Sequence, residues 1–194
     1  MNYAYEVVIG TEHPDKKIDW QSESLKRIPV VSYEDAVRDC DLVVLSVKGT
    51  VAESVAARIA PFTRGKTVID TTNPITETPP ENGVLHFFTN LDRSLMERLQ
   101  SSAPDSNFVK AWNSIGSALQ VNPDFGDDTP TMFICGNDEA AKKEVADIVR
   151  MFGFDVEDMG SVVSARAIEP LCMLWCIPGF EKGEWLHAFK LLKK

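Results

Sequence analysis

The stretch Gly65-Lys-Thr-Val-Ile-Asp-Thr-Thr-Asn-Pro74 decides how the rest of the sequence is interpreted. Residues 67–69 form an unbroken apolar or β-branched run, entered after a glycine and left through polar residues and a proline. A run without polar alternation, bounded by turn-forming residues, is typical of a parallel strand that is covered on both faces. Open α/β sheets bind ligands at the carboxyl ends of such strands. The polar residues 70–73 are therefore a candidate site, although an Asn-Pro pair can also serve only to end a strand.

Length and composition restrict the class of protein. A chain of 194 residues with 44% hydrophobic and 25% charged residues is long enough for one domain with a full core. The net charge of −9 argues against nucleic-acid binding, because no basic stripe is available to neutralise phosphates. No run reaches the length of a membrane span, and the N-terminus lacks a secretory pattern, so we expect no membrane association.

The four cysteines show no metal-ligand spacing, and Cys172 and Cys176 lie four apart on an apolar segment that reads as a helix. Buried free thiols are the simplest interpretation, and we expect a reduced, cytoplasmic compartment and no metal site.

Apolar runs and helical patterns alternate along the whole chain. The expected strands are 5–9, 29–31, 42–47, 67–69, 107–112, 131–135 and 154–156. The expected helices are 32–37, 51–59, 91–99, 117–121, 139–152, 164–175 and 185–192. Such alternation predicts βαβ units and a mostly parallel, doubly wound, Rossmann-like α/β sheet. We expect a dinucleotide-binding domain at 1–160, followed by C-terminal helices at 161–194 that pack on it or form a dimer interface.

Five segments, in order and spacing, resemble one protein family. They are Glu6-Val-Val-Ile-Gly10, Asp41-Leu-Val-Val-Leu-Ser-Val47, Gly65–Pro74, Val109-Lys-Ala-Trp-Asn-Ser-Ile-Gly116 and Ala165-Arg-Ala-Ile-Glu-Pro-Leu171. The chain resembles the NADP oxidoreductases that use the deazaflavin coenzyme F420, together with related NADPH-dependent ferric-reductase domains of the Steap type. The resemblance implies a Rossmann-like fold, an NADP cofactor and hydride transfer to a deazaflavin, flavin or other acceptor.

One departure from that family concerns the beginning of the sheet. Family members start with a strand, a G-x-G-x-x-G turn and a helix before the strand that is expected here at 5–9, and no such turn occurs in these residues. That turn holds the pyrophosphate of the cofactor. We therefore expect a sheet that lacks the usual first strand. Either the strands at 5–9 and 42–47 pair directly, or a strand comes from elsewhere, or the chain is a shortened product.

The resemblance implies cofactor contacts at the ends of several strands. These residues are Gly10, Thr11, Ser46, Val47, Lys48, Asn73, Pro74, Lys110, Ala111 and Asn113. No Ser-His-Asp, Cys-His or metal-ligand arrangement is evident, and no catalytic residue is expected, because hydride would pass directly between two cofactors. Arg166 and Glu169, three apart, are expected to pair with each other as a structural contact.

Glu12 stands where NADP users of this family commonly place an arginine. A carboxylate repels a phosphate but accepts a hydrogen bond from a ribose hydroxyl, so NAD becomes an alternative to NADP. His13, Lys16 and Lys17 follow closely and could compensate, or could simply form a solvated loop.

Three functions remain open from the sequence. The first is a nicotinamide-dependent oxidoreductase, for which alanine at Asn73 or Asn113 should slow hydride transfer and change stability by no more than about 1 kcal/mol. The second is a non-catalytic or binding-impaired Rossmann module that acts through its fold and dimer interface. The third, a pyrroline or hydroxyacid dehydrogenase, is disfavoured by the short C-terminal region. For the first two we expect a homodimer formed through 171–177.

Overall fold

The computed structural model describes residues 5–16 and 25–194, and its centre is a five-stranded sheet in the order β3-β4-β5-β6-β7. The strands are β3 (Leu42–Leu45), β4 (Thr67–Asp70), β5 (Asn107–Lys110), β6 (Thr131–Gly136) and β7 (Asp155–Asp158). β3, β4 and β5 are parallel, β6 runs antiparallel to β5, and β7 is parallel to β6. The predicted Rossmann-like, mostly parallel sheet followed by C-terminal helices is confirmed.

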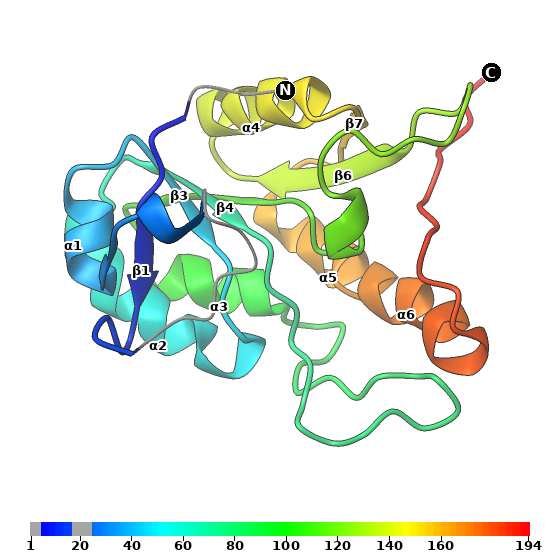
Figure 1. Cartoon of the computed structure of the whole chain (residues 1–194), viewed down its shortest axis with the longest axis horizontal. Coiled ribbons are helices and arrows are strands. Elements are labelled where there is room, and N and C mark those ends of the chain that lie inside the picture. Colours follow the sequence, from blue (N-terminus) through cyan, green and yellow to red (C-terminus); the bar gives the residue numbers. More distant parts are fainter. Residues whose placement is uncertain (1–4, 17–24) are drawn as a thin grey trace.

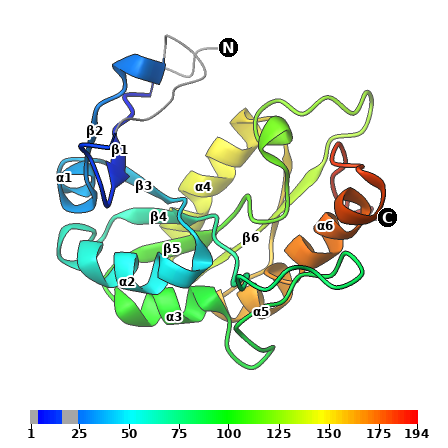
Figure 2. The same cartoon turned by 60° about the horizontal axis from the view of Figure 1, so that its bottom comes forward.

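The first two strands form a separate sheet. β1 (Ile9–Thr11) pairs in parallel with β2 (Val30–Ser32), and they lie with η1 (Leu25–Arg27) and α1 (Tyr33–Arg38) at one end of the molecule (Figures 1 and 2). Within the described residues β1 does not pair with β3, so the alternative of direct pairing is wrong. β3 is consequently an edge strand, and Val44 in its middle is 55% exposed.

Helices cover both faces of the central sheet. α2 (Gly49–Ile59), followed by η2 (Ala60–Phe62), packs beside α3 (Leu95–Ser102), and α4 (Glu139–Met151) lies on the opposite face (Figure 2). Successive residues of a strand point to opposite faces. Val68 and Phe108 therefore join the core beneath α2 and α3, whereas Ile69 and Val109 join the core beneath α4.

Local capping sets where the helices begin. Ser32 and Asp138 accept hydrogen bonds from the third backbone N–H of α1 and α4, as helix-capping side chains do. α3 begins at Leu95, later than the predicted 91, because Ser94 and Glu97 form a reciprocal capping box. The predicted helix at 117–121 is only the short turn η3 (Ser117–Leu119).

The C-terminal region differs most from the sequence prediction. η4 (Val162–Ser164), α5 (Ala165–Ile168) and α6 (Leu171–Lys182) follow β7, and α6 continues beyond Pro178 to a left-handed cap at Gly183. The predicted helix at 185–192 is wrong, because residues 183–194 form neither helix nor strand and follow an open path toward the C-terminus (Figure 1). Its backbone carbonyls accept hydrogen bonds from other elements and not from a helical turn. Thr131 N of β6 donates to Phe189 O at 2.8 Å, and Trp175 Nε1 of α6 donates to His187 O at 2.9 Å.

One helical stretch, Val162–Lys182, is long and apolar enough to cross a membrane by length and composition alone. A third (33%) of its apolar 18-residue window is buried inside the protein, and core helices of proteins without a membrane span meet the same criterion. Figure 1 shows α5 and α6 running beside the sheet.

Candidate dinucleotide-binding site

The turn after β4 is ordered by its first residue, Asp70. Its carboxylate is fully buried, and Oδ1 accepts hydrogen bonds from Thr72 N at 2.8 Å and from Thr72 Oγ1 at 2.7 Å. The other oxygen, Oδ2, lies 2.7 Å from Lys110 Nζ. The polar residues that the sequence singles out at 70–73 thus form a fixed turn at the carboxyl end of the strand.

Lys110 lies directly opposite Asp70 on β5 and is completely buried. Its ammonium contacts Asp70 and Glu169, with the nitrogen 3.2 Å from Glu169 Oε1, and donates to Thr72 O at 2.8 Å. Burial alone would lower the pKa of Lys110, but the two carboxylates outweigh this effect, and its pKa is raised. The side chain is therefore a buried structural cation that fixes the β4 turn.

Glu169 connects this network to α3. Its carboxylate accepts hydrogen bonds from Leu95 N at 3.0 Å and Met96 N at 2.9 Å, the otherwise unsatisfied donors at the start of that helix. Arg166 instead binds Glu97, at 2.9 Å from Nε and 2.6 Å from a terminal nitrogen. The predicted Arg166–Glu169 pair is wrong, because each side chain finds its counter-charge on another element.

Asn73 and Asn113 form a reciprocal pair. Asn73 Nδ2 donates to Asn113 O at 2.7 Å, and Asn113 Nδ2 donates to Asn73 Oδ1 at 3.2 Å and to Ile168 O at 3.0 Å. Asn73 is half-buried, whereas Asn113, Ala111 and Trp112 are buried. The structure thus brings together the predicted contacts at the ends of β4 and β5, with Asn73 as the more accessible amide.

The carboxyl end of β3 lies beside the Asn73–Asn113 pair. A Cβ on Gly49, the first residue of α2, would lie 1.9 Å from Asn73 O, so only glycine allows this approach. Ser46 is exposed and Val47 half-buried, and the exposed Lys48 pairs with Glu77 at 3.3 Å. The first turn of α2 carries no side-chain cap. Val51 N donates to Lys48 O at 3.1 Å, so the N–H groups of Gly49 and Thr50, which no side chain caps, are the ones that an anion beside the pair of asparagines could accept from.

The carboxyl end of β1 belongs to the separate two-stranded sheet, not to the five-stranded sheet that carries Asn73 and Asn113. Gly10 packs closely on α1, where its Cβ would meet Ala36 Cβ at 2.9 Å, and Thr11 Oγ1 accepts a 3.4 Å hydrogen bond from His13 N. Glu12 forms an ion pair with Arg58 of α2. His13 and Lys16 are exposed, while Lys17 lies outside the described residues.

Arg58 and Glu34 form a contact between α2 and α1 that the sequence did not indicate. Arg58 Nε lies 2.7 Å from Glu34 Oε1, and a terminal nitrogen lies 3.1 Å from Glu34 Oε2. The hydrogen bonds with Glu34 and Glu12 raise the pKa of Arg58, and the bond to Arg58 lowers the pKa of Glu34. No local spacing links residues that are 46 positions apart, as Glu12 and Arg58 are.

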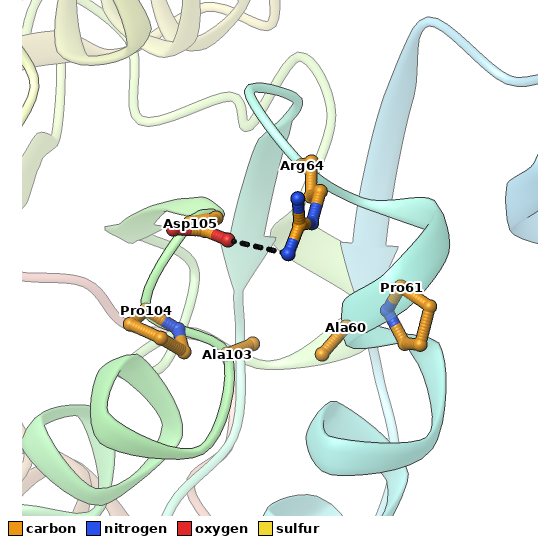
Figure 3. A pocket seen from close by; sticks show the side chains of 6 residues that line it. All are labelled: Ala60, Pro61, Arg64, Ala103, Pro104 and Asp105. Atoms are coloured by element: carbon orange, nitrogen blue, oxygen red, sulfur yellow. Dashed lines mark ion pairs between the residues drawn. The ribbon is translucent and has the colours of Figure 1, made fainter.

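An open pocket of about 520 Å³ lies at the opposite end of the strands. It is lined by Ala60, Pro61, Arg64, Ala103, Pro104 and Asp105, and an ion pair of 3.2 Å joins Arg64 to Asp105 (Figure 3). These residues precede β4 and β5, so the pocket contains none of the predicted contacts. Across residues 5–16 and 25–194, no cluster of three or more His, Cys, Asp or Glu side chains could hold a metal ion.

Comparison with known proteins shows which proteins the chain is similar to. Residues 1–74 match the family described as NADP oxidoreductase coenzyme F420-dependent. A solved structure of a candidate F420-dependent NADP reductase from Arthrobacter sp. FB24 superposes with a TM-score of 0.88 at 27% identity, covering 98% of this chain and 90% of that one. The chain is similar to the coenzyme F420-dependent NADP oxidoreductases.

Two curated proteins are similar to the chain over most of its length. The F420-dependent NADP reductase of Methanocaldococcus jannaschii is 28% identical over 73% of this chain and 63% of its own length. Metalloreductase STEAP3 of Rattus norvegicus is 33% identical over 90% of this chain. The chain spans only 34% of the length of that metalloreductase.

Proposed function

We propose that the chain is the dinucleotide-binding domain of an oxidoreductase that transfers a hydride between a nicotinamide cofactor and a deazaflavin, flavin or other acceptor. The observation that carries the proposal is the pair Asn73–Asn113, fixed beside the uncapped N-terminus of α2 where β3, β4 and β5 end. Ligands of open α/β sheets bind at such strand ends. The similarity to NADP oxidoreductases supports NADP, and Glu12 leaves NAD as an alternative.

The residues at these strand ends fit part of a dinucleotide. The backbone N–H groups of α2 would bind phosphate, and Asn73 offers an amide that could orient the nicotinamide carboxamide. When bound, the cofactor supplies or accepts the hydride. The protein then orients the ring through Asn73, which Asn113 and the buried Lys110 network hold in place, and shields it with the buried Pro74 and Ala111.

Titration of the folded chain with NADPH and with NADH, followed by calorimetry, tests the proposal. We expect saturable binding that Asn73→Ala weakens and that Asn107→Ala leaves unchanged. Asn107 provides the matched control because it lies at the other end of β5, where its amide donates to Gly65 O at 3.2 Å. A separate experiment identifies the acceptor. The chain is mixed with NADPH or NADH and with a flavin or deazaflavin, and absorbance shows which acceptor is reduced. Absence of binding by a folded chain would contradict the proposal.

The second candidate function is a non-catalytic or binding-impaired module. It is favoured by the strand pairing: in the described part of the chain the β1–β2 sheet is not hydrogen-bonded to β3, so the two sheets do not form one continuous dinucleotide-binding sheet. This function predicts no saturable binding of either dinucleotide, so the same titration distinguishes the two.

We also propose that two copies of the chain associate through α6 in a cytoplasmic homodimer. The support is the exposure of apolar side chains on α6, with Leu174 at 56% and Phe180 at 46%, whereas Cys172 and Trp175 of the same helix are buried.

A further inference from the structure

Two of the four free cysteines lie together on α6. Cys172 and Cys176 are four residues apart on this helix. Residues with this spacing are neighbours on one side of a helix, with about 5–6 Å between their Cβ atoms. A hydrogen bond joins the two thiols. The helix therefore carries a pair of interacting thiols.

The two thiols differ in their surroundings. Cys172 is 6% exposed, whereas Cys176 is half-buried, so a small molecule in solvent reaches Cys176 more readily. The shared hydrogen bond raises the pKa of Cys172, with burial adding to this effect, and it lowers the pKa of Cys176. The thiolate, and not the thiol, is the nucleophile in sulfur chemistry. The more accessible cysteine of the pair is therefore also the one that ionises more readily.

The other two cysteines do not combine these properties. Cys135 is fully buried, and burial raises its pKa to about 12. Cys40 is half-buried like Cys176, but burial raises its pKa, and its Sγ donates to Val37 O at 3.4 Å. Cys176 is therefore the cysteine that should react first, and Cys40 is the matched comparison.

We infer that Cys176 is a site of reversible thiol modification by small-molecule disulfides, and that Cys172 is the positioning residue that donates a hydrogen bond to its thiolate. The Cys176 thiolate attacks one sulfur of the disulfide and forms a new S–S bond with it. The original S–S bond breaks, and the other half leaves as a thiolate with the electron pair. Cys176 is thereby oxidised and the released half is reduced. This inference does not depend on the proposed function.

The helix keeps the modifying group on Cys176. A disulfide needs Cβ atoms about 3.5–4.5 Å apart, and neighbours four apart on a helix are separated by about 5–6 Å. Cys172 therefore does not displace the group by forming a disulfide with Cys176 unless α6 is distorted. An added thiol reverses the exchange and restores Cys176.

Reaction of the whole chain with dithiodipyridine, a neutral disulfide, tests the site through the absorbance of the released thiopyridone. At neutral pH we expect a fast phase about tenfold faster than the phase that follows it, with the adduct located on Cys176 by peptide mass spectrometry. The fast phase should disappear in Cys176→Ser and persist in Cys40→Ser, the matched control. A first reaction at Cys40, or a fast phase that survives in Cys176→Ser, would overturn the site.

The pH profile of the fast phase tests the role of Cys172. Cys172→Ala removes the hydrogen-bond donor, so the fast phase should slow severalfold and its profile should shift to higher pH. Cys172→Ser retains a hydroxyl donor and should keep the wild-type profile. An unchanged profile in Cys172→Ala would overturn the positioning role. Thermal melting of each variant shows that a changed rate does not come from a lost fold.

Discussion

At the scale of single residues, Lys110 is the group on which the candidate site depends. It is the cation that contacts both Asp70 and Glu169, which are buried with it, and it holds the β4 turn through Thr72 O. Lys110→Met should lower the free energy of unfolding by about 3–5 kcal/mol, because two carboxylates would remain buried without a cation. Urea denaturation measures the loss. Lys143→Met, at a side chain that is 79% exposed, is the control and should change stability by less than about 1 kcal/mol. A comparable effect of both variants would contradict the network.

The two asparagines should also differ from each other. The sequence predicted small stability changes for alanine at either position, but Asn113 is buried and donates to both Ile168 O and Asn73 Oδ1. Asn113→Ala should therefore cost about 1–3 kcal/mol, because it leaves a buried carbonyl without its donor. Asn73→Ala, at a half-buried position, should cost less and act mainly on dinucleotide affinity. Thermal melting together with the cofactor titration separates the two effects, and equal melting temperatures would contradict this assignment.

At the scale of elements, Glu97 joins α3 to α5. It caps α3 with Ser94 and pairs with Arg166, and the bond to Arg166 lowers its pKa from 4.5 to about 2. Because the folded value lies below the ordinary one, the stabilisation is present above about pH 4.5 and is lost as the pH falls toward 2. We expect a loss of about 2 kcal/mol across this range, allowing for solvent around the half-exposed Arg166. Urea denaturation at a series of pH values measures it. Glu97→Gln should remove this part of the pH dependence, and an unchanged slope would contradict the assignment.

At the scale of the whole molecule, α6 and the edge of β3 are the two surfaces at which we expect copies of the chain to associate. If α6 forms the dimer interface, Leu174→Glu should convert the dimer to a monomer, because it places a charge in an apolar contact. Light scattering measures the mass. Leu91→Glu is the control, since Leu91 is 71% exposed in the loop before α3 and should leave the mass unchanged. A monomeric wild-type chain would contradict the proposed dimer.

The second surface is the exposed edge of β3, which carries Val44. An exposed apolar edge strand is a template for pairing with another chain, and natural sheets commonly protect such edges with lysine. Val44→Lys should reduce concentration-dependent aggregation and change the free energy of unfolding by no more than about 0.5 kcal/mol. Turbidity at increasing concentration and urea denaturation measure the two quantities. Val51→Lys, at an exposed position of α2 with 43% exposure, is the control that adds the same charge away from the edge. Equal improvement by both variants would show that charge alone is responsible.

The sequence by itself determined the features that local patterns encode. The apolar runs at 42–47, 67–69 and 131–135 became β3, β4 and β6, and Asp138 with its helical periodicity defined α4. The motif residues Asn73 and Asn113 were also found, and the structure places them in contact. These features depend on residues near one another in sequence or on strand ends that a parallel sheet necessarily gathers.

Only the tertiary structure decided which partner each charged or terminal group takes. Arg166 binds Glu97 and not Glu169, Glu12 binds Arg58, and the segment expected as a last helix is not helical because Phe189 and Leu191 bind Thr131. The separation of β1 and β2 from β3 is a further example. Each of these outcomes is a competition between a local partner and a distant one. Burial and backbone hydrogen bonds decide that competition only after the elements have packed.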